Sequence, residues 1–338
     1  MRGRPILLGI VGDSAAGKTT ITRGLTRLLG PERVTHICAD DYHKYDRAER
    51  ARLNITALHP DCNFLDILEL HLERVHYGQA MLKPVYDHST GSLVRPEYVE
   101  PREFVIVEGL LGFHTPAMRQ FYDVKVFLDP TEDMRRVWKI KRDTSKRGYS
   151  PEQVLEELEK REPDSRDFIR PQREFADIVV RFHPESGTGS DQADGHLNVH
   201  LVLRPSIPHP DLTYLVSHKK NGHPDSIRLA LGRDCGRPVE FLEVDGNVSR
   251  EHATQLEEAI WKHLPDLRPL RADQFGDYND GSEVRHSDPL ALTQLLITYH
   301  LLRAYSKDSP MPFARPVAAL SRLKSVTNSR EERQPLRQ

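Results

Sequence analysis

The segment GIVGDSAAGKTT at residues 9–20 constrains the fold of this 338-residue chain more than any other segment. It contains the spacing GxxxxGK[ST], with an apolar run over residues 6–11 before it and a helical pattern from residue 18 onward. In such a loop the glycines allow backbone N–H groups to point inward around phosphate oxygens, and the following helix presents its positive N-terminus to the same anion. The segment therefore predicts a strand–loop–helix unit that binds a nucleoside triphosphate, in preference to a glycine turn that arose by chance.

Every residue of this loop is a candidate for nucleotide binding. Lys18 is expected to neutralise the β- and γ-phosphates, and the Thr19 hydroxyl is expected to help hold Mg²⁺. The predicted ATP-binding residues are Gly12, Asp13, Ser14, Ala15, Ala16, Gly17, Lys18, Thr19 and Thr20.

Apolar runs alternate with helical patterns through the first half of the chain. Most of these runs are continuous, which is typical of parallel strands that are covered on both faces. The expected strands are 6–11, 34–38, 104–107, 124–128 and 178–182, and the expected helices are 18–29, 66–77 and 131–147. Another helix should begin at Ser150, where Ser-Pro-Glu-Gln supplies an N-cap, a first-turn proline and a capping-box partner. This order predicts an α/β fold with a doubly wound, mostly parallel sheet that binds ligands at the carboxyl ends of its strands.

The second half of the chain predicts a smaller C-terminal α+β extension packed on the first domain. A polar, glycine-rich stretch at 184–195 indicates a surface loop, and a charged tail with little periodicity follows the last helical pattern. We expect strands at 197–203 and 239–244 and helices at 249–263 and 289–304. The predicted boundaries are 1–204 for the first domain, 205–310 for the extension and 311–338 for a mobile tail.

Composition excludes several classes of partner. The net charge is only −2, which does not indicate nucleic acid or an anionic membrane as a partner. No apolar run approaches the roughly 18 residues of a membrane helix. Cys38, Cys62 and Cys235 form no CxxC pair, so neither a disulfide framework nor a zinc site is indicated. We expect a cytoplasmic protein in a reducing compartment.

The segment CADDYHKYDR at 38–47 follows the second expected strand and therefore lies at the same sheet edge as the loop. Transfer of a phosphoryl group to a hydroxyl needs a carboxylate that orients the oxygen and accepts its proton. Asp40 and Asp41 are both candidates, and the residues alone do not choose between them. The alternative is a turn rich in aspartate hydrogen bonds, which is common after strands.

Glu108 ends the apolar run in FVIVEGLLGFH, residues 104–114. An acid at the end of a buried strand beside a phosphate loop is well placed for Mg²⁺ or its water shell. A carboxylate that only caps a turn or a helix is the alternative.

The helix expected at 131–147 has an apolar face and a basic one. Arg135, Lys139, Arg142 and Lys146 recur at helical spacing, with Asp143 and Arg147 alongside. Several cations on one face repel each other unless an anion lies there, so this stripe indicates a phosphate lid more than a solvated surface.

The segment KPVYDHSTG at 83–91 indicates an exposed turn with Tyr86 and His88. A histidine in such a turn is usually only solvated, so these residues alone give His88 no function.

Taken together, these segments resemble the phosphoribulokinase/uridine kinase family of P-loop kinases. The resemblance covers roughly residues 5–183, and it includes TALHPD at 56–61 and KREPDSRDFIRPQ at 160–172. The pairing of DDYHKYDR with KIKRDTSKRG is similar to the phosphoribulokinase branch. The extension, especially YLVSHKKNG and RPVEFLEVDG, more loosely resembles the longer, dimeric members.

The resemblance implies an ATP-dependent kinase that phosphorylates D-ribulose 5-phosphate, with ATP and Mg²⁺ as cofactors and a homodimer as the assembly. It favours Asp40 over Asp41 as the catalytic base, and Lys139, Arg142 and Asp143 as further catalytic residues. Thr19, Asp40 and Glu108 are expected to hold the metal. The implied substrate-binding residues are His43, Arg47, Tyr86, His88, Arg147 and Arg161.

One position departs from the plant-type members, which have a cysteine in the phosphate loop that pairs with one just before the catalytic acid. Here Cys38 occupies the second place but Ala16 occupies the first. That disulfide is therefore not expected.

Two other functions compete with the first. A uridine-type nucleoside kinase shares the loop and the acid motif, but it needs groups that recognise a base edge instead of a second phosphate. A P-loop switch or scaffold that binds nucleotide without transferring phosphate needs no base directed at a sugar. The acid pair and the lid helix argue against the switch, and the uridine-type kinase stays the alternative.

Overall fold

The computed structural model describes residues 3–184, 196–213, 226–263, 276–279 and 283–308. Within these residues the centre of the molecule is an eight-stranded sheet with the order β2-β5-β1-β6-β7-β8-β10-β9. The first five strands in that order are parallel, and the last three join antiparallel. The strands are β1 (Ile6–Gly12), β2 (Val34–Cys38), β5 (Phe104–Gly109), β6 (Val124–Leu128), β7 (Ile178–His183), β8 (Asn198–Leu203), β9 (Ile227–Asp234) and β10 (Arg237–Val244).

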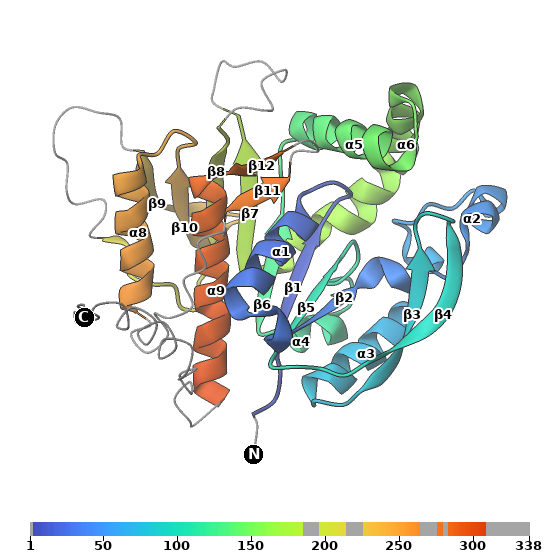
Figure 1. Ribbon diagram of the computed structural model, residues 1–338, viewed down its shortest axis with the longest axis horizontal. Coiled ribbons are helices and arrows are strands. Elements are labelled where there is room, and N and C mark those ends of the chain that lie inside the picture. Colours follow the sequence, from blue (N-terminus) through green and yellow to red (C-terminus); the bar gives the residue numbers. More distant parts are fainter. Residues whose placement is uncertain (1–2, 185–195, 214–225, 264–275, 280–282, 309–338) are drawn as a thin grey trace, which may run out of the picture.

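The sheet is mostly parallel and has helices on both faces, which confirms the predicted fold class (Figure 1). Every residue of β1 and β5 is buried, as continuous apolar runs in a covered parallel sheet should be. One apolar core joins the sheet to α1 (Lys18–Leu29), α8 (Arg250–Lys262) and α9 (Asp288–Asp308). A second core on the other face includes α3 (Leu65–His76) and α4 (Pro116–Gln120).

Two further helices, α5 (Glu132–Arg147) and α6 (Pro151–Asp164), lie together beyond one end of the sheet (Figure 1). The predicted helix start at Ser150 is confirmed, because its side chain accepts from the Gln153 backbone and forms a full capping box. The short helix α2 (Arg47–Leu53) begins with a second capping box, between Asp46 and Glu49.

The prediction of an exposed turn at 83–91 was wrong for its first half. Residues 81–87 form strand β3 (Met81–Asp87), which pairs with β4 (Ser92–Val99) in a separate hairpin. Only residues 88–91 form the turn, which Gly91 closes by donating to the Asp87 carbonyl and adopting a positive φ of 76°. Pro84 and the exposed residues of β4 interrupt the alternation that normally reveals a strand.

The extension continues the same sheet, because β8 pairs with β7 on one side and with β10 on the other. Strand β9, which was not predicted, forms the outer edge. Helix α9 packs directly on α1 at Gly24, where a Cβ atom would lie 2.0 Å from the Gln294 amide nitrogen. The division at 204/205 stays a prediction. The expected loop at 184–195, apart from its first residue, and the expected tail at 311–338 lie outside the described residues.

Two short strands, β11 (Asp277–Asn279) and β12 (Val284–His286), pair with each other next to the start of α9. Among the helices that the structure describes, none has the length and apolar character needed to cross a membrane.

Candidate functional site

The loop between β1 and α1 has the conformation of an anion cradle. Ala15 and Gly17 both adopt positive φ, at 67° and 94°, so that the backbone curls at the end of β1. Gly17 is the N-cap of α1, and no side chain of the described residues caps this helix end. The Lys18 ammonium donates to the carbonyls of Gly12 and Asp13, each at 2.9 Å, and so lies inside the loop. This geometry presents backbone N–H groups and one cation to a phosphate.

Asp13 is held in place from three sides. One carboxylate oxygen accepts from the Ser14 backbone at 2.6 Å, and the other accepts from the Ser165 hydroxyl. The Arg135 guanidinium lies 3.5 Å from the first of these oxygens. Ser165 follows α6, 152 residues further along the chain, and no local pattern identifies it as a contact of the loop.

Glu108 lies at the end of β5, which is hydrogen-bonded to β1, and its carboxylate therefore reaches the start of α1. It is 6% exposed. One oxygen lies 3.4 Å from the Thr19 hydroxyl, and the other lies 3.3 Å from the Thr22 hydroxyl. Two oxygen groups of the predicted metal set, Thr19 and Glu108, are thus adjacent.

The structure distinguishes Asp40 from Asp41, which both lie in the short 3₁₀ turn after β2. Asp41 accepts from the buried Lys83 ammonium, and its other oxygen accepts from the Tyr86 backbone at 3.0 Å. The Asp40 carboxylate makes no hydrogen bond or ion pair with any part of the chain that the structure describes. Asp41 therefore fastens the β3–β4 hairpin to the sheet, whereas no group in the described ranges occupies the Asp40 carboxylate.

His43, Tyr86 and His88 pack as a cluster beside Asp40. The ring centroids of His43 and Tyr86 lie 4.8 Å apart, and those of Tyr86 and His88 lie 5.1 Å apart. Burial lowers the pKa of both histidines, and the negative charge of Asp40 opposes part of that shift. His43 donates from Nδ1 to the Asn63 amide oxygen at 2.7 Å, so its Nε2 is left as an acceptor.

Two arginines of α2 hold this cluster. Arg47 donates to the His88 carbonyl at 2.7 Å. Arg50 donates to the Tyr86 hydroxyl at 2.6 Å, and its guanidinium lies 4.9 Å from the centre of the Tyr86 ring. Arg50 was not singled out in the sequence, although it follows Arg47 by three residues on the same helix.

The basic stripe of α5 is organised around Asp143. This carboxylate accepts from Lys139 at 2.9 Å and Arg142 at 2.8 Å, and it lies 3.5 Å from Arg147. Burial alone would raise the pKa of Asp143, but the hydrogen bonds from Arg142 and Lys139 hold it at about 2. Burial and the charge of Arg161 lower the pKa of Lys139 to about 8, against the opposing effect of Asp143. One carboxylate thus faces several cations. The group has a net positive charge, which a bound anion would neutralise.

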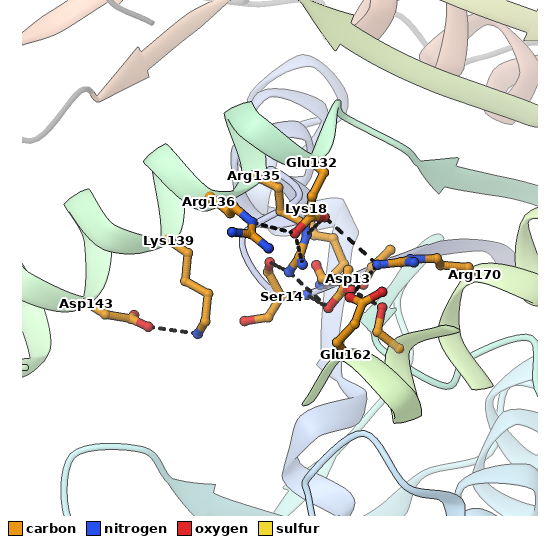
Figure 2. A network of polar contacts seen from close by, with 12 residues as sticks. Asp13, Ser14, Lys18, Glu132, Arg135, Arg136, Lys139, Asp143, Glu162 and Arg170 are labelled. Atoms are coloured by element: carbon orange, nitrogen blue, oxygen red, sulfur yellow. Dashed lines mark hydrogen bonds and ion pairs between the residues drawn. The ribbon is translucent and has the colours of Figure 1, made fainter. Parts of the chain in front are cut away.

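The same helix contacts the phosphate loop (Figure 2). Arg142 donates to the Ser14 hydroxyl at 3.3 Å, and Arg135 donates to the Ser14 carbonyl at 3.4 Å. Arg135 is itself fixed by two hydrogen bonds to Glu132, at 2.7 and 2.8 Å. The predicted lid therefore meets the predicted loop.

Arg161 lies on α6 and pairs with Glu157 at 2.8 Å. It lines a shallow depression, partly open to solvent, between the loop and the two lid helices. The other lining residues are Asp13, Ser14, Arg135, Lys139, Leu158, Glu162 and Ser165.

The predicted site residues thus form one continuous region. The positive charges of Arg142 and Arg147 lower the pKa of His88, and the negative charge of Asp40 raises it. Asp40 also raises the pKa of His43. The charge of Glu108 raises the pKa of Cys38. Burial raises the pKa of the Cys38 thiol well above its usual range, and Ala16 in the loop offers no thiol to it. The groups that the sequence left unassigned are Lys83, Arg50, Ser165 and His36, each a partner of a predicted residue.

Comparison with known proteins agrees with this geometry. The model of the Phosphoribulokinase / Uridine kinase family matches residues 7–188. Phosphoribulokinase from Synechocystis sp. is 36% identical over 256 residues, which are 72% of this chain and 77% of that protein. Uridine kinase from Chloroflexus aggregans is 36% identical over 185 residues, which are 53% of this chain and 88% of that protein.

Among solved structures, phosphoribulokinase from Rhodobacter spheroides resembles this chain with a TM-score of 0.56 and 19% identity. The likeness covers 80% of this chain and 98% of that one, and it concerns the fold alone. The family model matches more than half of the chain and includes the loop, the acid turn, Glu108 and the lid helices. The chain therefore belongs to the phosphoribulokinase/uridine kinase family.

Proposed function

We propose that this protein transfers the γ-phosphoryl group of ATP to D-ribulose 5-phosphate and forms D-ribulose 1,5-bisphosphate. The observation that carries the proposal is the Asp40 carboxylate, which has no hydrogen-bond or ion-pair partner among the described residues. It neighbours His43 and His88 at the same sheet edge as the phosphate loop. The relationship to phosphoribulokinase supports it, because that similarity extends over 72% of the chain.

In this proposal Asp40 accepts the proton of the acceptor hydroxyl as its oxygen attacks the γ-phosphorus. The bond from that phosphorus to the β–γ bridging oxygen breaks, and ADP leaves. Negative charge on the transferred group is offset by Lys18 from the loop and by Lys139 and Arg142 from the lid. The other loop residues bind ATP through their backbone, and Asp143 keeps the lid cations in position.

An acceptor that already contains a phosphate requires a second anion site. Arg47, Arg147 and Arg161 supply the cations we assign to it, with His43, Tyr86 and His88 near the sugar hydroxyls. A uridine-type kinase is the alternative, but the uridine kinase relative aligns with only 53% of this chain. The concentration of arginines favours a phosphate over a nucleobase at this end of the site.

The residues fit Mg²⁺. Its preferred ligands are oxygens, and it is usually held by one or two carboxylates together with substrate phosphates. Glu108 and the Thr19 hydroxyl provide such oxygens beside the loop, and the described residues contain no cluster of three or more metal-ligating side chains. We assign Thr19, Glu108 and Asp40 to the ion, which when bound would neutralise charge on the phosphates.

A coupled assay of ADP release tests the function. Ribulose 5-phosphate, uridine, pantothenate and no acceptor are compared at equal ATP and Mg²⁺. We expect the turnover rate with ribulose 5-phosphate to be at least about ten times the rate with uridine, with pantothenate or without an acceptor. Turnover with uridine would favour the nucleoside kinase, and acceptor-independent hydrolysis would favour a nucleotide switch.

Replacing Arg47 or Arg161 with alanine is expected to raise the KM for ribulose 5-phosphate about tenfold or more, because a charge-assisted contact to phosphate is lost. The KM for ATP should change far less. Arg52→Ala and Lys160→Ala, which remove exposed cations from the same two helices, serve as controls and should change neither constant. An effect confined to ATP would assign these arginines to the nucleotide instead.

We also propose a homodimer held through strand β9. This strand is one of the two edges of the eight-stranded sheet, and its Leu231 is 84% exposed. Exposed apolar edges are usually paired or covered, and symmetric pairing gives a C2 dimer.

Light scattering of the wild-type protein should give the mass of two chains, and the substitution Leu231→Asp should shift the measured mass toward that of one chain. Leu82→Asp, at a 62% exposed leucine on β3, is the matched control. A wild-type mass of one chain or of eight chains would refute the dimer.

A further inference from the structure

His36 on β2 contacts the carboxylate that we assign to the metal. Its Nε2 lies 3.1 Å from Oε1 of Glu108. An ionised carboxylate can only accept a hydrogen bond, so the imidazole donates from Nε2. His36 belongs to neither the phosphate loop nor the acid turn, and the function proposed above gives it no role.

Strand pairing explains how the ring reaches Glu108. Cys38 is directly opposite Glu108 in the parallel register of β2 and β5, and His36 lies two residues earlier on the same face of β2. The imidazole therefore extends along the strand toward the carboxylate. The His36 side chain is 43% exposed, whereas that of Glu108 is 7% exposed, so the contact joins a half-exposed imidazole to a buried carboxylate.

Among the hydrogen bonds that described side chains make to Glu108, the one from His36 is the shortest. The hydroxyl contacts of Thr19 and Thr22 are longer, at 3.4 and 3.3 Å. Thr19 is itself assigned to the metal, so binding of the ion would compete with its contact to Glu108. His36 and Thr22 then remain to fix the direction of the carboxylate.

We propose that His36 is a positioning residue that orients Glu108 toward the divalent cation of the bound nucleotide. The proposal rests on the proposed function only in that Glu108 serves a metal–nucleotide complex, and it does not depend on which acceptor is phosphorylated. In this role the imidazole acts on the metal through Glu108.

Two variants test this role. His36→Val removes the donor, and His36→Gln keeps an N–H donor near the position of Nε2. The first measurement is binding of Mn²⁺ in the presence of ADP without any acceptor, by electron paramagnetic resonance. His36→Val should weaken Mn²⁺ binding about tenfold, as is typical when a partner of a metal ligand is lost, and His36→Gln should restore most of it.

The second measurement separates positioning from structure. At saturating Mg²⁺ the kcat of His36→Val should stay within about twofold of wild type, while the KM for Mg²⁺ rises in proportion to the loss of Mn²⁺ affinity. His200→Val is the matched control, because His200 on β8 donates to Glu243 at the same distance of 3.1 Å. It should leave Mn²⁺ binding unchanged.

Wild-type Mn²⁺ affinity in a folded His36→Val variant would overturn the proposal, and so would equal losses in the valine and glutamine variants. If the wild-type protein binds Mn²⁺ and ADP but does not phosphorylate ribulose 5-phosphate, the acceptor assignment fails and the role of His36 stands. Failure of the wild-type protein to bind Mn²⁺ with ADP would overturn both.

Discussion

Replacing Asp40 with asparagine is expected to lower kcat by about three orders of magnitude or more while leaving ATP binding intact. The substitution keeps the size of the side chain but removes the group that accepts the proton and orients the acceptor hydroxyl. Folding should be unaffected, because this carboxylate has no partner in the described part of the chain. Steady-state kinetics with ribulose 5-phosphate, together with equilibrium binding of an ATP analogue, measures both properties.

Asp41→Asn provides the matched comparison one residue away. It removes the charge that pairs with Lys83, which is 3% exposed, and a buried cation that loses its partner destabilises the fold. We therefore expect a lower Tm and, at temperatures where the variant is folded, a much smaller loss of kcat. Near-normal turnover of Asp40→Asn combined with an inactive, folded Asp41→Asn would exchange the two assignments.

Replacing Lys18 with methionine is expected to lower kcat/KM for ATP about 1,000-fold, since one preorganised cation at the transferred phosphate is lost. Within the described part of the chain, the ammonium donates only to the loop carbonyls of Gly12 and Asp13, and its removal should not unfold the protein. Thr19→Ala should mainly raise the KM for Mg²⁺, because it removes a hydroxyl assigned to the ion. Kinetics at varied ATP and Mg²⁺, with circular dichroism to check folding, measures these effects.

Arg23→Met is the control for this experiment, because Arg23 is an exposed cation on the same helix α1. It lowers the net positive charge of the helix by the same amount without touching the loop. We expect wild-type kinetics from it. A Lys18→Met enzyme with unchanged KM and kcat for ATP would be incompatible with the proposed nucleotide site.

Local pattern was sufficient for the central part of the fold. Strands 34–38 and 124–128 and helix 18–29 have the bounds that their sequences predict. The prediction worked because each is a single apolar run or a single periodic stretch bounded by turn residues. It failed for β3, where Pro84 breaks the alternation, and for β9, an edge strand with little buried surface. Such strands are defined by their hydrogen-bonded neighbours more than by their own composition.

The residues of the candidate site likewise divide into those that the local sequence predicts and those that it does not. Gly12–Thr19, Glu108 and the basic stripe of α5 were predictable because their chemistry is written in adjacent residues or at helical spacing. Arg161 and the preference for Asp40 came only from the family resemblance. The anchoring roles of Lys83 and Ser165 had no local signal, because each contacts a residue more than forty positions away in the chain.

By itself the sequence determined that a phosphate loop lies between a buried strand and a helix, and that acidic and basic groups follow at the same edge of a parallel sheet. Tertiary structure alone decided which of the two acids has no partner among the residues that the structure describes. Asp40 and Asp41 are adjacent and chemically equivalent in the sequence, and only the packing of β3 delivers Lys83 and the Tyr86 backbone to Asp41. The pairing of β2 with β5 likewise brings His36 to Glu108. The physical reason is that the state of a carboxylate depends on the donors around it, and folding gathers those donors from distant parts of the chain.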